Sequence, residues 1–153
     1  MTGGRKLEEV ENHMEREILR MEVESRSSNE EFARVAVAVF MSRLDPTMEE
    51  IDDVKTAVSE AVTNAVIHGY QGKDGIIYIQ VAIERQLLSV EIRDLGVGIR
   101  DVEKAMEPMY TTDTTGERSG MGFSFMEAFM DEVQVRSAPG QGTCVIMKKR
   151  IGR

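Results

Sequence analysis

Apolar and polar positions follow recognisable periods along this 153-residue chain. Five segments alternate between apolar and polar residues, as half-buried strands do. Two segments repeat apolar residues at helical spacing, and a third is apolar on most sides, as buried helices are. The predicted strands are residues 19–23, 77–83, 88–92, 132–136 and 143–149, and the predicted helices are 28–44, 47–69 and 122–130. This order predicts an α+β fold, a two-layer sandwich of a mixed, mostly antiparallel sheet with helices on one face.

The first predicted helix begins at an S-x-x-E capping box formed by Ser28 and Glu31. Bulky apolar residues recur along it at helical spacing, and we expect this stripe to face the core. The stripe consists of Phe32, Val35, Val39 and Phe40. Arg34 lies off the stripe, where an exposed arginine usually contributes little to stability.

The second predicted helix begins at another capping box, formed by Thr47 and Glu50. Gly69 is placed to end this helix in the left-handed conformation. His68 lies in the last turn, where a cation interacts favourably with the helix dipole, so we expect a capping or structural role.

Glu60 and Asn64 lie four residues apart on this second helix and therefore share one face. The apolar residues of the helix lie on the opposite face, toward the expected core. Alone, a carboxylate and a carboxamide on the polar face of a helix are typical of a solvated surface. The glycine loops that follow later in the chain favour a functional role for this pair.

The net charge of −8 and the isoelectric point near 4.9 argue against nucleic acid as the main partner. An acidic protein can still bind a nucleotide if backbone N–H groups and a divalent cation offset the repulsion. Cys144 is the single cysteine, which excludes an internal disulfide and fits a reducing compartment.

The length fits one domain, residues 18–153, preceded by an N-terminal extension of residues 1–17 that is helical or disordered. The extension carries charges throughout and has no apolar run of signal-peptide length. No stretch approaches ~18 consecutive apolar residues, the length that a membrane span requires. We therefore expect a cytoplasmic protein without a membrane anchor.

Two glycine-rich stretches are candidates for ligand binding. Asp94 ends a predicted strand and precedes Gly96 and Gly98, so its carboxylate can accept a hydrogen bond from an exocyclic amine while the glycines let backbone approach a flat ligand. An ordinary turn explains the same residues.

The second stretch follows residues 107–120, which lack any apolar period and predict a lid that ends in ERSGMGF. Backbone N–H groups there, with Arg118, form a candidate phosphate cradle.

The order of these pieces resembles the GHKL family of ATP-binding domains, which have the Bergerat-type fold. The pieces are E-x-x-x-N on a helix, D-x-G-x-G after a hairpin, G-x-G after a lid, and G-T on a late strand. The stretches SEAVTNAVIHGY, RDLGVGI, PMYTT and ERSGMGF are similar to those of the bacterial anti-sigma serine kinases, in their sporulation form. The resemblance covers residues 20–149. A Rossmann domain is excluded separately, because no predicted strand runs into a G-x-G-x-x-G at the start of a helix.

The resemblance implies a site for ATP or ADP with Mg²⁺. Glu60 would accept the proton of the attacking serine hydroxyl, and Asn64 would coordinate Mg²⁺ between the phosphates. Asp94 would receive the adenine amino group with support from Thr143, and Arg34 would contact protein partners. The remaining implied residues surround the base or the phosphates: Gly96, Gly98, Arg118, Ser119, Gly120, Met121 and Gly122.

The activity that the resemblance implies is twofold. A homodimer would sequester a sigma factor, and it would phosphorylate a serine of the anti-anti-sigma factor that displaces this sigma factor. Three alternatives stay open: a general-stress anti-sigma kinase, a non-catalytic module whose nucleotide state sets partner affinity, and a small ATPase. A histidine kinase is disfavoured, because no phosphoacceptor histidine or dimerising helix pair precedes the domain.

Overall fold

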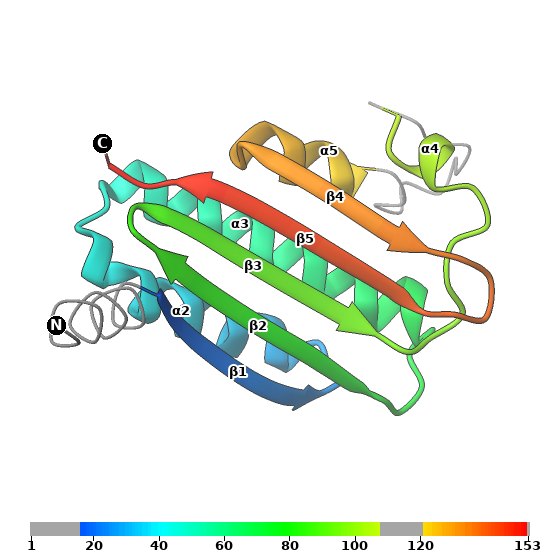
Figure 1. Cartoon of the computed structure of the whole chain (residues 1–153). Helices are drawn as coiled ribbons and strands as arrows, with labels where there is room; N and C mark the ends of the chain where they lie inside the picture. The colour runs from blue at the N-terminus through cyan, green and yellow to red at the C-terminus, as the bar shows by residue number, and fades with distance from the viewer. Residues whose placement is uncertain (1–15, 108–120, 153) are drawn as a thin grey trace, which may run out of the picture.

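A five-stranded sheet covered on one face by three helices forms the described part of the computed structural model, residues 16–107 and 121–152 (Figure 1). The sheet has the order β1-β2-β3-β5-β4, and each of its four neighbouring pairs is antiparallel. Its strands are β1 (Arg16–Glu24), β2 (Ile76–Glu84), β3 (Leu87–Asp94), β4 (Glu132–Ser137) and β5 (Thr143–Arg150). The helices that cover it are α2 (Ser28–Met41), α3 (Met48–Asn64) and α5 (Met121–Phe129). The predicted two-layer α+β fold is confirmed.

The core lies between this sheet and the helices. In β2 and β3, every second residue is buried, and the register places Ile79 opposite Ile92 and Val81 opposite Val90. Because successive side chains of a strand point to opposite faces, the intervening polar residues share the face that the helices leave uncovered. The alternation in the sequence therefore predicted the buried face of these strands correctly.

The predicted core stripe of α2 is wrong for three of its four residues, whereas the fourth, Phe40, is half-buried and packs against the core. Ala33, Val37 and Met41 are the buried residues of this helix, whereas Phe32, Val35 and Val39 are 58%, 47% and 66% exposed. The helix carries apolar residues nearly all round, so periodicity offers two stripes, and the stripe with the smaller residues packs against its neighbours. The predicted capping box is also wrong, because Ser28 is already helical and Ser27 occupies the N-cap position.

The central helix α3 begins as predicted. The side chain of Thr47 accepts a hydrogen bond from the N–H of Glu50, and the Glu50 carboxylate accepts one from the N–H of Thr47. The helix ends in a π-turn, η2 (Ala65–Gly69), rather than in a left-handed glycine. Left-handed backbone follows at Gln71 and Gly72, so the chain turns two residues later than predicted.

The predicted boundaries need one further adjustment. Arg16 and Glu17, assigned to the extension by sequence, are the first residues of β1. Residues 1–15 of the extension and residues 108–120 of the predicted lid lie outside the described residues. The short helix α4 (Val102–Ala105) precedes the latter and is capped by Asp101. Among the described helices, none has the length and apolar character needed to cross a membrane.

Candidate nucleotide-binding site

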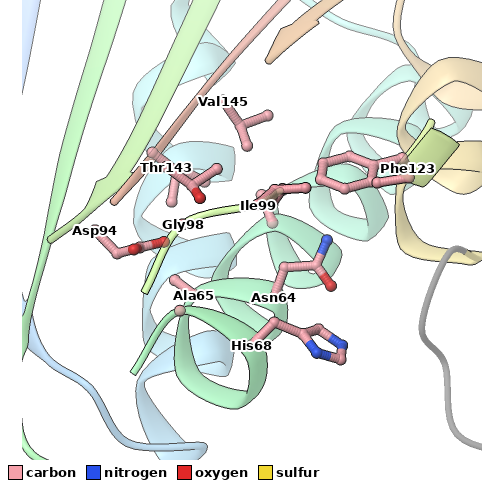
Figure 2. Close-up of a pocket in the computed structure, with 13 residues that line it drawn as sticks. Asn64, Ala65, His68, Asp94, Gly98, Ile99, Phe123, Thr143 and Val145 are labelled. Carbon is pink, nitrogen blue, oxygen red and sulfur yellow. The ribbon is translucent and has the colours of Figure 1, made fainter. Parts of the chain in front are cut away.

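A cavity of about 310 Å³ lies where the C-terminal end of α3 meets the ends of β3 and β5 and the start of α5 (Figure 2). We call it the main cavity, and its size falls within the range of small-molecule sites. Four predicted site residues line it: Asn64, Asp94, Gly98 and Thr143. The other lining residues are Ala61, Ala65, His68, Gly69, Ile92, Ile99, Ala105, Phe123 and Val145.

Asp94 is the buried carboxylate of the main cavity, with only 4% of its surface exposed. Its Oδ1 accepts a hydrogen bond of 2.9 Å from the N–H of Gly96. Burial raises the pKa of Asp94, and the backbone N–H groups of Gly96 and Thr143 lower it, with burial the larger effect. A fixed acceptor in an apolar surrounding can select a ligand with an amine at the matching position.

The glycines around Asp94 make room for the protein's own backbone. A Cβ atom on Gly96 would lie 1.9 Å from the carbonyl oxygen of Gly69, which accepts a hydrogen bond of 2.9 Å from the N–H of Val97. A Cβ atom on Gly98, at φ +76°, would lie 1.9 Å from the carbonyl oxygen of Ala138. Gly98 lines the main cavity, whereas Gly96 packs against the backbone of Gly69 and is not among the lining residues, and the close approach of both glycines to a flat ligand stays a prediction.

Ser137 forms hydrogen bonds at the end of the main cavity where Asp94 and Thr143 lie. The sequence did not predict it as a site residue. Its hydroxyl oxygen accepts a hydrogen bond of 2.7 Å from the N–H of Ile99, donates one of 2.8 Å to the carbonyl oxygen of Gly142 and lies 2.8 Å from Oγ1 of Thr143. A serine at a strand end carries no distinctive pattern, so only the fold brings it beside Thr143.

The walls of the main cavity are apolar and were also missed as site residues. Phe123 is 6% exposed and comes from α5, while Ile92 and Val145 come from β3 and β5. Sequence periodicity assigns such residues to the core, and they do belong to it. Their surfaces toward the cavity form the kind of apolar slot in which a flat aromatic ligand fits.

Polar groups at the opposite end of the main cavity come from the end of α3 and from η2. Figure 2 shows Asp94 and Thr143 at one end, Asn64 and His68 at the other, and Gly98 and Ile99 between them. A Cβ atom on Gly122 would lie 3.0 Å from Nδ2 of Asn64, so Gly122 lies against this amide. His68, expected to have only a capping or structural role, lines the cavity as well.

The Asn64 amide fits a Mg²⁺ ion that is bound mainly by substrate phosphates. Mg²⁺ at nucleotide sites commonly takes one or two protein oxygens and several phosphate or water oxygens. The residues described here contain no cluster of three acidic, histidine or cysteine side chains that would hold a metal ion alone. Arg118, Ser119 and Gly120, predicted to meet the phosphates, lie outside the described residues, and Met121 is described only as the first residue of α5.

Glu60 does not line the main cavity. It is 8% exposed and lines a second cavity of about 490 Å³ between α2 and α3, which we call the α2–α3 groove. The predicted shared polar face of Glu60 and Asn64 therefore divides between two cavities on different sides of α3. The groove is lined by Glu30, Arg34, Asp52, Lys55, Thr56, Ser59, Glu60 and Thr63.

Arg34 lies in the α2–α3 groove as a half-exposed side chain, with Nη1 3.5 Å from the carboxylate of Glu30. Within the described residues, its Nε and the hydroxyl of Ser59 are buried and have no hydrogen-bond partner. Buried polar atoms without partners are rare in folded proteins, and a bound ligand is one of their explanations. Among the described residues, Arg34, Ser59 and Glu60 thus line the same groove, and the first two each carry a buried polar atom without a hydrogen-bond partner.

The main cavity has Asp94 and glycine-packed backbone at one end, the Asn64 amide at the other and apolar walls between them, an arrangement suited to a small ligand with polar groups at both ends. Residues 23–149 match the family described as "Histidine kinase-like ATPase domain". The chain is 57% identical over 141 residues to a protein of Clostridium acetobutylicum named "Anti-sigma F factor", covering 92% of this chain and 95% of the relative. It is 58% identical over 134 residues to a protein of the same name from Clostridium novyi, covering 87% and 94%.

The chain therefore belongs to the histidine kinase-like ATPase domain family, which binds nucleotides, and within it to the anti-sigma F factors. Its fold is similar to the crystal structure of the RsbU and RsbW domains of Rv1364c from Mycobacterium tuberculosis. That likeness has a TM-score of 0.63 at 19% identity and covers 90% of this chain and 32% of the longer one. The family resemblance expected from the sequence is confirmed.

Proposed function

We propose that this protein is an anti-sigma factor and an ATP-dependent protein serine kinase. It binds and inhibits a sporulation sigma factor, and it phosphorylates a serine of the anti-anti-sigma factor that displaces this sigma factor. Relatives named anti-sigma F factor, which match nearly the whole chain, support the first activity. In this proposal it acts as a homodimer in the cytoplasm, without direct contact to nucleic acid, as its net charge of −8 favours.

The placement of Glu60 is the observation that carries the kinase activity. Glu60 is buried in the α2–α3 groove, one helical turn from Asn64 in the main cavity. One turn of an α-helix rises about 5.4 Å, a short separation between a phosphate donor site and an acceptor site. A solvated surface carboxylate, the plain alternative for this residue, would not be 92% shielded from solvent.

The proposed reaction transfers the γ-phosphoryl group of ATP to a serine hydroxyl that enters the α2–α3 groove. Glu60 accepts the hydroxyl proton, the serine oxygen bonds to the γ-phosphorus, the bond from that phosphorus to the β–γ bridging oxygen breaks, and ADP leaves. Asp94 and Thr143 bind the adenine end, and Asn64 would hold Mg²⁺ beside the phosphates. The bound ion would supply charge neutralisation at the phosphates, and most of the remaining acceleration would come from positioning.

The exposed apolar surface of α2 supports the proposal that this helix binds protein partners. Phe32, Val35 and Val39 expose apolar side chains to solvent on this helix, and Arg34 lies on its groove side. Exposed apolar side chains that gather on one helix are typical of protein-binding surfaces. We propose that Arg34 contacts both the sigma factor and the anti-anti-sigma factor.

The test is a phosphorylation assay with labelled Mg·ATP and the small anti-anti-sigma-like protein encoded nearest to this one. We expect Glu60→Ala to lower the transfer of label by at least about 10²-fold, the contribution of a general base, and to leave ATP affinity within about twofold. Glu84→Ala, which removes an exposed carboxylate at the end of β2 that lines neither cavity, is the matched control and should retain transfer.

Unchanged transfer by Glu60→Ala would remove the catalytic role of this residue. A wild-type protein that transfers no label but forms a nucleotide-dependent complex would instead be a nucleotide-gated binding module. Steady ATP hydrolysis without any protein substrate would indicate a small ATPase. Titration calorimetry with ATP on each variant separates loss of binding from loss of transfer.

A further inference from the structure

The hydroxyl of Tyr70 links three elements beside the main cavity. It donates a hydrogen bond of 2.5 Å to the carbonyl oxygen of Ile76, the first residue of β2. It accepts a hydrogen bond of 2.8 Å from the N–H of Leu95, the residue that follows β3. Tyr70 itself follows η2, so one side-chain oxygen joins the end of the helix region to the ends of two strands.

This hydrogen bond belongs to a set that fixes residues 94–98, which we call the 94–98 loop. Three successive N–H groups of the loop have three different acceptors: the Tyr70 hydroxyl for Leu95, the Asp94 carboxylate for Gly96 and the Gly69 carbonyl for Val97. Two of these acceptors come from the adjacent residues Gly69 and Tyr70. The chain after α3 therefore holds the loop on both sides of Gly96.

The surroundings of Tyr70 leave its ring little freedom to move. The ring is half-buried and packs against the core. A Cβ atom on Gly75 would lie 2.4 Å from the ring, so only glycine at this position leaves room for it. A hydroxyl on a wedged ring with two hydrogen bonds is a rigid acceptor, and rigid supports are what precise binding sites need.

We propose that Tyr70 is a positioning residue of the nucleotide site. Its hydroxyl holds the 94–98 loop so that the Asp94 carboxylate meets the exocyclic amine of adenine. Tyr70 does not line the main cavity, so it acts through the loop rather than by touching the ligand. The inference rests on the proposed role of Asp94 at the adenine end and does not depend on kinase activity.

Removal of the hydroxyl has a specific consequence for ligand selection. The Leu95 N–H loses its acceptor, and the loop that carries Asp94 loses one of its two anchors to residues 69–70. ATP and ADP share the adenine group, so both should bind more weakly by the same factor. Guanine presents a carbonyl oxygen where adenine has its amine, so GTP gains nothing from the position of Asp94.

The test is titration calorimetry of Tyr70→Phe with ATP, ADP and GTP, each with Mg²⁺. We expect about a tenfold loss of affinity for both ATP and ADP, which corresponds to one hydrogen bond, and little change for GTP, so the preference for ATP over GTP falls. The matched control is Tyr78→Phe. Tyr78 lies on β2 under the guanidinium of Arg93, on the sheet face that the helices leave uncovered, so its hydroxyl cannot support Asp94 from the cavity side and all three affinities should stay within about twofold.

A second variant should disturb the 94–98 loop by moving the Tyr70 ring, without removing its hydroxyl. In Gly75→Ala the added methyl group displaces the Tyr70 ring, so the preference for ATP over GTP should fall in the same direction. A lower melting temperature of Tyr70→Phe with unchanged affinities and selectivity would overturn the proposal, because the tyrosine would then be merely structural. A loss for ATP that ADP does not share would overturn it as well.

Asp94→Asn separates this proposal from the site assignment on which it rests. Weaker ATP binding by Asp94→Asn with unchanged binding by Tyr70→Phe would remove only the role of Tyr70. Unchanged ATP binding by Asp94→Asn would remove the adenine assignment of Asp94 and the Tyr70 proposal with it.

Discussion

On one side of α3 the chain forms a mostly apolar cavity, and on the other side it forms a groove lined by charged side chains. The main cavity has aliphatic and aromatic walls, with polar groups at its two ends. The α2–α3 groove instead carries five charged residues, Glu30, Arg34, Asp52, Lys55 and Glu60. This difference suits a flat nucleotide base on one side and a polar polypeptide segment on the other.

The two sides also differ in what holds them together. Around the main cavity, glycine backbone packs against other backbone, and the contacts leave no space for a Cβ atom. In the α2–α3 groove, long side chains meet at ion-pair distances, such as the 3.5 Å between Arg34 and Glu30. Backbone contacts cannot rearrange cheaply, whereas long side chains can. Substitutions should therefore have their largest effects at the main cavity.

Gly96→Ala is expected to have the largest effect. Its Cβ atom would lie 1.9 Å from the Gly69 carbonyl oxygen, so the 94–98 loop must separate from η2 and lose the bond between Val97 and Gly69. We expect destabilisation of about 3 kcal/mol, the upper end of overpacking costs, together with loss of measurable ATP binding. Chemical denaturation and titration calorimetry measure the two effects.

The control for Gly96→Ala is Gly72→Ala. Gly72 has φ +75° and no neighbouring atom within 4 Å of an added Cβ, so alanine there costs only backbone strain. We expect about 1 kcal/mol of destabilisation and unchanged ATP binding. Equal effects of the two substitutions would mean that the close approach of Gly96 to Gly69 does not shape the main cavity.

Asp94→Asn is expected to have the next largest effect. One carboxylate oxygen becomes an amide donor, which in the proposed site would face the donor amine of adenine and leave both groups without a partner. We expect ATP affinity to fall by about 10- to 100-fold, or roughly 1–3 kcal/mol. Equal affinity of Asp94→Asn and wild type in titration calorimetry would exclude Asp94 from the adenine contact.

The pH dependence of binding gives an independent check on Asp94. Burial raises its pKa in the free protein, so protons compete with adenine at a higher pH than at an ordinary aspartate. ATP affinity of the wild type should fall as the pH is lowered toward this raised pKa, because the ionised acceptor is then lost. The asparagine variant does not titrate, so its affinity should lack this component.

The sequence predicted the main cavity better than the groove, for a physical reason. The alternating pattern predicted that Asp94 ends one strand and that Thr143 begins another, and the family resemblance implied that the two residues share a site. The structure pairs these strands and places Asp94 opposite Thr143. The position of Asn64 near the C-terminal end of α3 could be predicted, because the capping box at Thr47 fixes where this helix begins. Ser137 and Phe123 could not be predicted as site residues, because their roles depend on the packing of β4 and α5 rather than on any local pattern.

The sequence-based predictions failed at the α2–α3 groove because the orientation of α2 was predicted wrongly. Phe32, Val35 and Val39 were assigned to the core, but Ala33, Val37 and Met41 are the residues of α2 at 0% exposure. The same assignment left the α2–α3 groove unforeseen, and with it the burial of Glu60. Periodicity gives the orientation of a helix only when one face is clearly polar, and α2 has no such face.

Arg34→Ala tests whether α2 binds protein partners. Its effect should be smaller than those of Gly96→Ala and Asp94→Asn. Arg34 is 37% exposed and its ion pairs stay within α2, so the fold should keep its stability within about 0.5 kcal/mol. We expect affinity for the sigma factor and the anti-anti-sigma factor to fall about five- to tenfold, as for a half-exposed charged contact, and ATP affinity to stay unchanged.

Arg26→Ala is the control for Arg34→Ala, since Arg26 precedes α2 and pairs with Glu24 on the exposed surface. Biosensor binding in the presence of ADP measures both partners, and equal losses in the two variants would reflect net charge rather than a contact of Arg34.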